Sequence, residues 1–309
     1  MTTTTATTDT RPMRLFRVRV ARIADLTPSF RRFTFTGDDL HEYGDTGFDQ
    51  RIKVVFPVEG GSLDTMPTEG EWYSQWREMP AEERHPFRTY TTRAVRHDVR
   101  EVDVDMVAHD VSGPASLWIR DARVGDEVML AAPTIHHGGA NLGLDFVPPE
   151  RTEQYLLVGD ETAAPAIAVM LEQLPPSASG VVVLEVPDER DAPYLPAHPG
   201  FRVDVAGRGD GERHAHLLRA AAAHARELCP DGRGAEVEEI DVDTTLLWEV
   251  PRSAKGGAAL KSAPLYAWVA GESAAVKQVR RDLVREVGVD RRAVAFMGYW
   301  RLGKSEATV

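Results

Sequence analysis

Cysteine is nearly absent from this sequence, because Cys229 is the single one among 309 residues. One cysteine excludes a disulfide within the chain and any iron–sulfur or zinc site with four cysteine ligands. This usage is typical of a reducing compartment. Any electron chemistry carried out by this chain therefore needs a cofactor that is not held by cysteines.

The sequence also lacks long apolar runs and an excess of positive charge. No uninterrupted apolar stretch reaches the roughly 20 residues of a membrane helix, and residues 1–10 lack the layout of a secretory signal. The 48 acidic residues outnumber the 36 basic ones, and the resulting net charge of -12 would repel a polyphosphate backbone. We therefore expect no membrane insertion, no nucleic-acid partner and a cytoplasmic location.

Several catalytic signatures are missing as well. The sequence contains no Gly-x-Ser-x-Gly elbow, no glycine-rich Lys-Ser/Thr phosphate loop and no haem-attachment pair, which argues against hydrolases and NTPases. The histidine pairs His136-His137 and His214-Ala215-His216 have no carboxylate or cysteine at the usual metal-ligand spacing. We expect these histidines on the surface and predict no metal site.

The hydrophobic pattern predicts two domains after a disordered leader, residues 1–13, which is threonine-rich and has little to bury. Residues 14–150 show the period-two alternation of half-buried strands, with one short helix after Pro114, and are predicted to form a closed antiparallel β-barrel. The expected strands are residues 14–20, 33–35, 51–56, 88–92, 101–107 and 127–131. The pair Pro148-Pro149 marks the domain boundary.

Residues 151–309 alternate strands with helices and are predicted to form a parallel α/β domain. The expected strands are residues 155–158, 181–186, 201–205, 266–270 and 294–297, and the expected helices begin near residues 165, 214 and 273. Residues 229–262 are rich in Gly, Asp and Glu and are predicted to form a long connection with a short strand at 246–250. The fold class is therefore an antiparallel barrel followed by a parallel α/β domain.

An arginine, an aromatic ring and several hydroxyls are concentrated on the strand Arg88-Thr89-Tyr90-Thr91-Thr92-Arg93. Arg88 and Tyr90 point to the same face of a strand, so a ring lies beside a guanidinium that can bind phosphate. An exposed Arg–Tyr pair without a ligand would show the same pattern. The motif resembles the flavin-binding strand of the ferredoxin-reductase superfamily, in which the Arg binds pyrophosphate, the Tyr stacks on the isoalloxazine and the hydroxyl lies near N5.

A second motif is Gly113-Pro114-Ala115-Ser116, which follows His109. Proline is favoured at the first helical position, so a helix is expected to begin here with free amides that can bind an anion. An ordinary strand-to-helix turn would contain the same residues. With the arginine strand upstream, the expected anion is the FAD pyrophosphate, contacted by amides near Ala115 and by Ser116.

A third motif runs from Tyr155 to Pro165 and contains Asp160, Thr162 and Ala163 in the turn between a strand and a helix. The first turn of a parallel α/β unit lies at the edge of the sheet where dinucleotides dock. The turn is not a Gly-x-Gly-x-x-Gly fingerprint, and Asp160 or Thr162 could instead cap the helix. Because a carboxylate repels pyrophosphate, a contact to adenine or ribose is the expectation here.

In their order and spacing these motifs resemble the siderophore-interacting protein family, flavoproteins of the ferredoxin-reductase superfamily, over about residues 14–304. The resemblance implies reduction of Fe(III) in an imported siderophore with FAD and NADH or NADPH, followed by release of Fe(II). Two residues depart from the family pattern, Asp110 in place of a glycine and Ala132 in place of the glycine of a Gly-Pro pair. The implied cofactor-binding residues are Arg88, Tyr90, Thr91, Arg93, His109, Gly113, Pro114, Ala115, Ser116, Asp160, Thr162 and Ala163.

Ferric siderophores are often anionic, so an acidic protein needs local cations at the flavin to bind them. Lys53 resembles the lysine that the family places in its basic siderophore pocket, and Arg301 and Lys304 follow the last strand as its expected partners. A solvated strand lysine or a tail cation is the alternative for each of them.

Two other functions are compatible with the same residues: a general NAD(P)H flavin or diaphorase-type reductase, and a siderophore-binding chaperone with structural FAD. The diaphorase would not need a basic pocket, and the chaperone would hold a flavin that NAD(P)H cannot bleach. Arg208 could hold a 2′-phosphate, but this leaves the choice between NADH and NADPH open. The siderophore class, the flavin potential and the oligomeric state are open too, and a monomer is compatible with the sequence.

Overall fold

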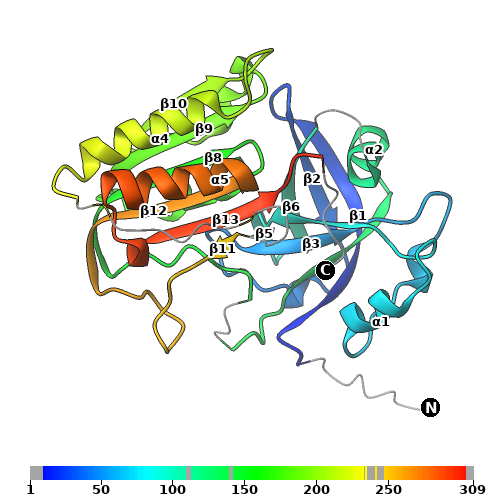
Figure 1. Cartoon of the computed structure of the whole chain (residues 1–309). Helices are drawn as coiled ribbons and strands as arrows, with labels where there is room; N and C mark the ends of the chain where they lie inside the picture. The colour runs from blue at the N-terminus through cyan, green and yellow to red at the C-terminus, as the bar shows by residue number, and fades with distance from the viewer. Residues whose placement is uncertain are drawn as a thin grey trace, which may run out of the picture.

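The computed structural model of the chain describes residues 10–108, 113–138, 142–232, 234, 241 and 247–303. The predicted site residues His109 and Lys304, and the departure at Asp110, lie outside these ranges. Within them, the first half of the chain forms one antiparallel sheet and the second half forms a mixed sheet covered by helices, as the sequence predicts (Figure 1). In the described part of the chain, no helix is long and apolar enough to cross a membrane.

The first sheet has seven strands in the order β4-β3-β7-β1-β2-β6-β5. These strands are β1 (Met13–Asp25), β2 (Phe30–Thr36), β3 (Arg51–Val55), β4 (Phe87–Thr91), β5 (Ala94–Arg96), β6 (Glu101–Val107) and β7 (Glu127–Pro133). The two strands at the ends of this order, β4 and β5, are consecutive in the chain. Thr92 and Arg93 join them, and their amides donate to the carbonyls of Gln50 and Asp103 on opposite sides. The end strands β4 and β5 are therefore not paired with each other, and the predicted barrel is completed by the residues that connect them, Thr92 and Arg93.

Alternate residues of these strands point into the barrel and form its core, for example Phe16, Val18 and Val20 of β1. The helix α2 (Pro114–Asp121) contributes Trp118, whose ring centre lies 5.1 Å from that of Phe33. This packing explains why the period-two pattern predicts six of the seven barrel strands. The seventh, β5, has only three residues and is not predicted.

The prediction of one helix in this half is wrong, because a second one, α1 (Trp72–Glu78), covers the outside of β3 and β4. Trp76 is buried there against Val55 and Phe87, and its indole nitrogen donates to the carbonyl of His85. Seven residues are too few for a clear helical period, and tertiary packing stabilises such a short helix.

The second sheet has the strand order β10-β9-β8-β12-β13-β11, and all neighbours are parallel except β11 and β13. Its strands are β8 (Arg151–Asp160), β9 (Gly180–Val186), β10 (Phe201–Gly207), β11 (Trp248–Glu249), β12 (Ser262–Glu272) and β13 (Val294–Trp300). The antiparallel β11 lies inside the predicted short strand at 246–250. The short helical turns are η1 (Leu40–Glu42), η2 (Leu63–Thr65), η3 (Glu189–Tyr194), η4 (Arg281–Val287) and η5 (Arg291–Ala293).

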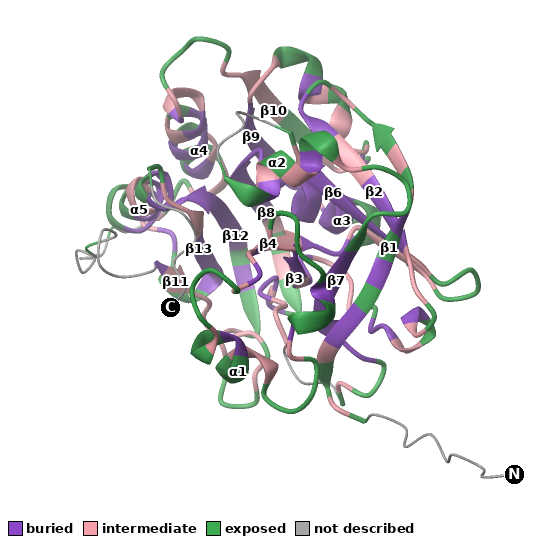
Figure 2. Ribbon diagram, turned by 90° about the vertical axis from the view of Figure 1, so that its right-hand side faces the viewer, coloured by how far each residue is buried: buried purple, intermediate pink, exposed green. Residues whose placement is uncertain are grey.

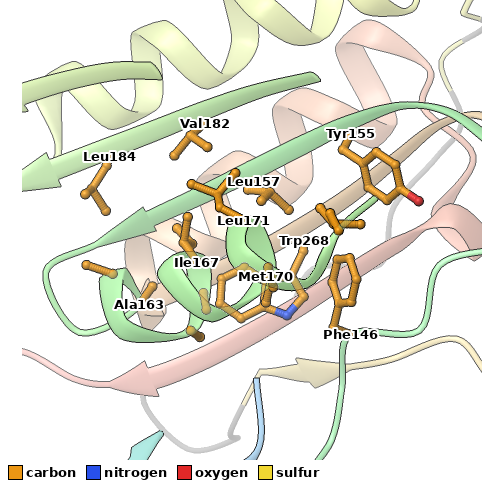
Figure 3. Packing of buried hydrophobic residues seen from close by; sticks show 14 of the residues in the cluster. Phe146, Tyr155, Leu157, Ala163, Ile167, Met170, Leu171, Val182, Leu184 and Trp268 are labelled. Carbon is orange, nitrogen blue, oxygen red and sulfur yellow. The ribbon is translucent and has the colours of Figure 1, made fainter. Parts of the chain in front are cut away.

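Helices cover both faces of this sheet. On one face, α3 (Ala164–Gln173) packs Ile167, Met170 and Leu171 against strand residues such as Leu157 and Val182 (Figure 3). On the other face, α4 (Ala215–Leu228) and α5 (Ser273–Arg280) lie side by side. The four central strands β8, β9, β12 and β13 are buried along most of their length (Figure 2), which accounts for their continuous apolar runs.

Buried polar contacts join the two halves. The carboxylate of Asp49, before β3, accepts hydrogen bonds from the amide of Phe146 at 2.9 Å and from the indole of Trp268 on β12 at 3.0 Å. Burial raises the pKa of Asp49 to about 6. In a second contact, the hydroxyl of Tyr194 on η3 donates to Asp105 on β6 at 2.7 Å. These contacts join the start of β3 and the strand β6 to the α/β half.

Candidate functional site

The first sheet meets the second one at the β3–β4 edge. Arg51, whose register partner on β4 is Thr91, donates to Asp145 at 2.7 Å and lies over the ring of Trp248 on β11 at 4.2 Å. Trp248 in turn stacks on Tyr299 of β13, with ring centres 5.7 Å apart. The strand that carries the predicted flavin-binding residues therefore adjoins the end of the last strand of the α/β half.

Arg88 and Tyr90 occupy the middle of β4 opposite Val54 and Ile52, two residues of the barrel core. The guanidinium of Arg88 donates to the carbonyl of Phe87 at 2.7 Å, and no carboxylate in the described part of the chain forms an ion pair with it. Tyr90 is half-buried and packs against the barrel core. Arg88 therefore retains donors for an anion, next to an aromatic ring.

The next residues of this strand have protein partners. Thr91 is buried, and the hydroxyl of Thr92 lies 2.8 Å from the hydroxyl of Tyr43. Arg93 forms a two-bond ion pair with Glu172 on α3, at 2.5 and 2.7 Å, and lies 3.5 Å from Asp105. Arg93 thus joins the two halves of the chain, and its predicted contact to the cofactor stays a prediction.

The predicted helix start at Pro114 is confirmed as the beginning of α2. Gly113 precedes it as the N-cap residue, with a φ of 108° that glycine adopts without strain. Because glycine has no side chain, Gly113 makes no capping hydrogen bond to the helix amides. A Cβ on Gly113 would meet nothing within 4 Å. The amides near Ala115 and Ser116 thus begin a helix to which its N-cap residue, Gly113, gives no side-chain hydrogen bond, and such amides can bind an anion.

Asp160 ends β8 and is fully buried. One carboxylate oxygen accepts bonds from the amide and hydroxyl of Thr162, and the other accepts from the amide of Glu272 and the indole of Trp300, both at 2.8 Å. Burial, followed by the nearby Glu161, raises its pKa to about 6. Asp160 therefore fastens the ends of β8, β12 and β13 together, and Ala163 packs beneath it in the core.

The predicted substrate cations come from both sheets. Lys53 lies on the outer face of β3, with its ammonium 4.6 Å from the ring centre of Phe87 and 3.4 Å from the hydroxyl of Thr89. Arg301 directly follows β13 and is partly buried. Arg51, two residues before Lys53, is a cation at this junction that the sequence did not single out, because only its contact to Trp248 reveals its place.

Comparisons with known proteins agree with this arrangement in both halves. Residues 19–137 match the family model described as siderophore-interacting FAD-binding domain, and residues 152–303 match the one described as siderophore-interacting protein. An uncharacterized protein of Mycobacterium tuberculosis is 32% identical over 300 residues, which cover 96% of this chain and 93% of that protein. The chain belongs to the siderophore-interacting protein family.

Two further similar proteins have names that refer to siderophores or to ferric reduction. The ferric vibriobactin reductase ViuB of Vibrio cholerae is 29% identical over 276 residues, covering 89% of this chain and 85% of that protein. The siderophore-interacting protein SipS of Aeromonas hydrophila has a solved structure with a TM-score of 0.68 and 26% identity, covering 96% of this chain and 95% of that one. Each of these proteins thus matches both the barrel and the α/β half of this chain.

As a siderophore-interacting protein, the chain has its FAD-binding domain in the barrel half. The residues present fit that cofactor. Arg88 retains donors for a pyrophosphate, and the start of α2 after Gly113 offers backbone amides beside Ser116. Both are groups that bind phosphate oxygens.

Proposed function

We propose that this protein is an NAD(P)H-dependent FAD oxidoreductase that reduces Fe(III)-siderophores in the cytoplasm and so releases Fe(II). The observation that carries the proposal is the position of β4, with its arginine and tyrosine, at the junction with the α/β half. A dinucleotide at the edge of that sheet and a flavin on β4 would then meet. The similarity to a ferric vibriobactin reductase over both halves supports a ferric siderophore as acceptor.

In this proposal the protein supplies binding and orientation. Arg88 and the amides near Ala115 and Ser116 hold the pyrophosphate, and Tyr90 gives the ring a packing surface. Bound FAD supplies the chemistry that accepts a hydride from the nicotinamide and delivers electrons singly to iron. Asp160 keeps the ends of three strands in register, so that the edge which receives the nicotinamide nucleotide is rigid.

One anaerobic titration tests this function. The purified protein is loaded with FAD and then receives NADH, NADPH and finally a ferric siderophore, while the flavin absorption is followed. We expect a nicotinamide nucleotide to bleach the flavin and the siderophore to restore its colour. A bound flavin that neither nucleotide bleaches would favour the siderophore-binding chaperone, and a reduced flavin that dyes but not siderophores reoxidise would favour the diaphorase.

Lys53 separates the siderophore reductase from a general diaphorase. Because a partly desolvated cation attracts an anionic chelate more strongly than an exposed one, we expect Lys53→Ala to weaken apparent binding of an anionic ferric siderophore by about tenfold, or ~1.4 kcal/mol. The advantage of the wild type should shrink as salt is raised. Steady-state kinetics with an anionic chelate and a neutral dye measure both effects. Equal losses with the two acceptors would remove Lys53 from the substrate pocket.

A further inference from the structure

Three neighbouring strands, β8, β9 and β10, end at the same edge of the second sheet (Figure 1). The loops that follow them, residues 161–163, 187–200 and 208–214, contain three arginines: Arg190, Arg208 and Arg213. In sheets that bind dinucleotides, a carboxylate at this edge accepts a hydrogen bond from the ribose 2′-hydroxyl of NAD, whereas an arginine binds the 2′-phosphate of NADP. The partners of the three arginines therefore bear on the choice between the two nucleotides.

Arg208 is held by two buried carboxylates. Its guanidinium lies 3.2 and 3.3 Å from the oxygens of Glu161 and 3.5 Å from Glu185, and its side chain is 9% exposed. The side chains of both glutamates are 2% exposed. Since a buried ion pair loses much of its stability when one partner is withdrawn, Arg208 is not available to an incoming phosphate.

The other two arginines also have carboxylate partners. Arg213 lies 3.5 Å from Glu161 and packs over the ring of Trp300 at 5.5 Å. Arg190 donates to Asp188 at 3.0 Å. These two pairs are more exposed than that of Arg208, since the side chains of Arg213 and Arg190 are 34% and 76% exposed. A 2′-phosphate that enters beside Glu161 and Glu185 therefore finds no unpaired buried cation there among the described residues.

His214 is a buried polar side chain at this edge whose ring is left without a hydrogen-bond partner among the described residues. It is 7% exposed, and neither ring nitrogen has a hydrogen-bond partner among the described residues. Its ring lies between Glu185, 4.0 Å from Nδ1, and Trp300, with ring centres 6.3 Å apart. A buried polar group of this kind is normally satisfied, so an unpaired imidazole at a dinucleotide edge indicates that a bound molecule provides its partner.

The prediction that His214 lies on the surface is wrong for a local reason. Its amide donates to Glu185 at 2.6 Å, and its φ of 68° turns the chain at the start of α4. Burial is the main cause that lowers the pKa of His214, so the ring is neutral at pH 7. A neutral imidazole offers one donor and one acceptor, which suits hydroxyl groups and adds no positive charge for a phosphate.

We propose that this edge selects NADH over NADPH, because His214 offers an uncharged partner to the adenosine ribose while Glu161 and Glu185 hold Arg208 away from it. This inference rests on the proposed function, because it assumes that a nicotinamide nucleotide binds here. A 2′-hydroxyl can bond to the imidazole of His214, whereas a 2′-phosphate would lie beside a buried arginine that already has its carboxylates. The selectivity thus arises from the carboxylates that neutralise the arginines.

Binding of two nucleotide fragments to the FAD-loaded protein tests the proposal without turnover. We expect ADP-ribose to bind at least about tenfold more tightly than 2′-phospho-ADP-ribose in calorimetry, a difference of ~1.4 kcal/mol, and kcat/KM for flavin reduction to favour NADH in the same sense. Equal or tighter binding of the phosphorylated fragment would overturn the selectivity and leave the proposed reductase standing. If neither fragment binds and neither nucleotide bleaches the flavin, the proposed function and this inference both fail.

A charge-removing variant tests the cause of the selectivity. Glu161→Gln keeps the shape of the side chain but removes one of the two carboxylates beside Arg208 and the carboxylate beside Arg213. The preference for ADP-ribose should therefore fall about tenfold toward the phosphorylated fragment. The matched control is Glu227→Gln, which breaks the exposed pair with Arg202 on the same sheet and should leave the preference unchanged. An unchanged preference in Glu161→Gln would overturn the assignment to Glu161. The wild-type comparison stands even if this variant does not fold.

Discussion

Replacing Asp105 with alanine is expected to lower the free energy of unfolding by about 3–5 kcal/mol, as for other buried ion pairs that lose one partner. The side chain of Asp105 is fully buried. It accepts two bonds from Arg32, at 2.7 and 2.8 Å, and one from the hydroxyl of Tyr194 at 2.7 Å, and it lies 3.5 Å from Arg93. Its removal would leave two guanidiniums without this countercharge and a hydroxyl without an acceptor.

Urea unfolding of the wild type and the variant measures this loss. The control is Asp25→Ala, which breaks an Arg31 pair of the same length, 2.7 Å, at a carboxylate that is 71% exposed. Because exposed ion pairs contribute little, the control should lose less than about 1 kcal/mol. Similar losses in the two variants would show that Asp105 does not stabilise the junction between barrel and α/β half.

Local patterns were enough to predict most of the fold. Strands such as β1 follow a period of two because one face is buried in the barrel, and β8 is a short continuous apolar run because helices cover both its faces. The patterns miss the three-residue strand β5 and the helix α1, whose buried Trp76 contacts residues of β3 and β4. Its stability depends on contacts between segments, which periodicity does not contain.

The candidate site could be predicted only in part for the same reason. Arg88, Tyr90 and the helix start at Pro114 belong to short continuous motifs, and the structure places them as elements of β4 and α2. The partners of Arg93 and Asp160 are far away in sequence: Glu172 lies 79 residues from Arg93, and Trp300 lies 140 residues from Asp160. A sequence motif cannot reveal partners that are so far apart in the chain. These partners nevertheless decide which charged side chains remain available to a ligand.

Arg208 shows how partners that are distant in sequence change a functional prediction. As a lone arginine in a loop it suggests a 2′-phosphate contact, whereas its bonds to Glu161 and its proximity to Glu185 make it part of a neutralised cluster. Arg88 is the opposite case, since it forms no ion pair with a carboxylate of the described chain. Two arginines of similar appearance in the sequence thus differ in their capacity to bind phosphate.

Because Arg88 retains donors for phosphate, we predict that its replacement has a large effect on FAD binding. Because a pair of charged groups with direct hydrogen bonds loses about 2–5 kcal/mol when one partner is truncated, we expect Arg88→Ala to weaken FAD binding by about 100-fold, or ~2.7 kcal/mol. The stability of the protein without flavin should change little, since among the described residues the guanidinium bonds only to the carbonyl of Phe87. Arg88→Lys should recover part of the affinity, because an ammonium keeps the charge but not the two-bond geometry.

FAD titrations followed by flavin fluorescence measure these affinities, and unfolding of the flavin-free proteins measures their stability. Arg19→Ala is the matched control, because Arg19 is an exposed arginine on β1 of the same barrel and its removal changes the net charge equally. We expect this control to bind FAD like the wild type. If Arg88→Ala also binds FAD like the wild type, β4 does not hold the pyrophosphate. If both variants weaken binding to the same degree, the effect reflects net charge and not a direct contact.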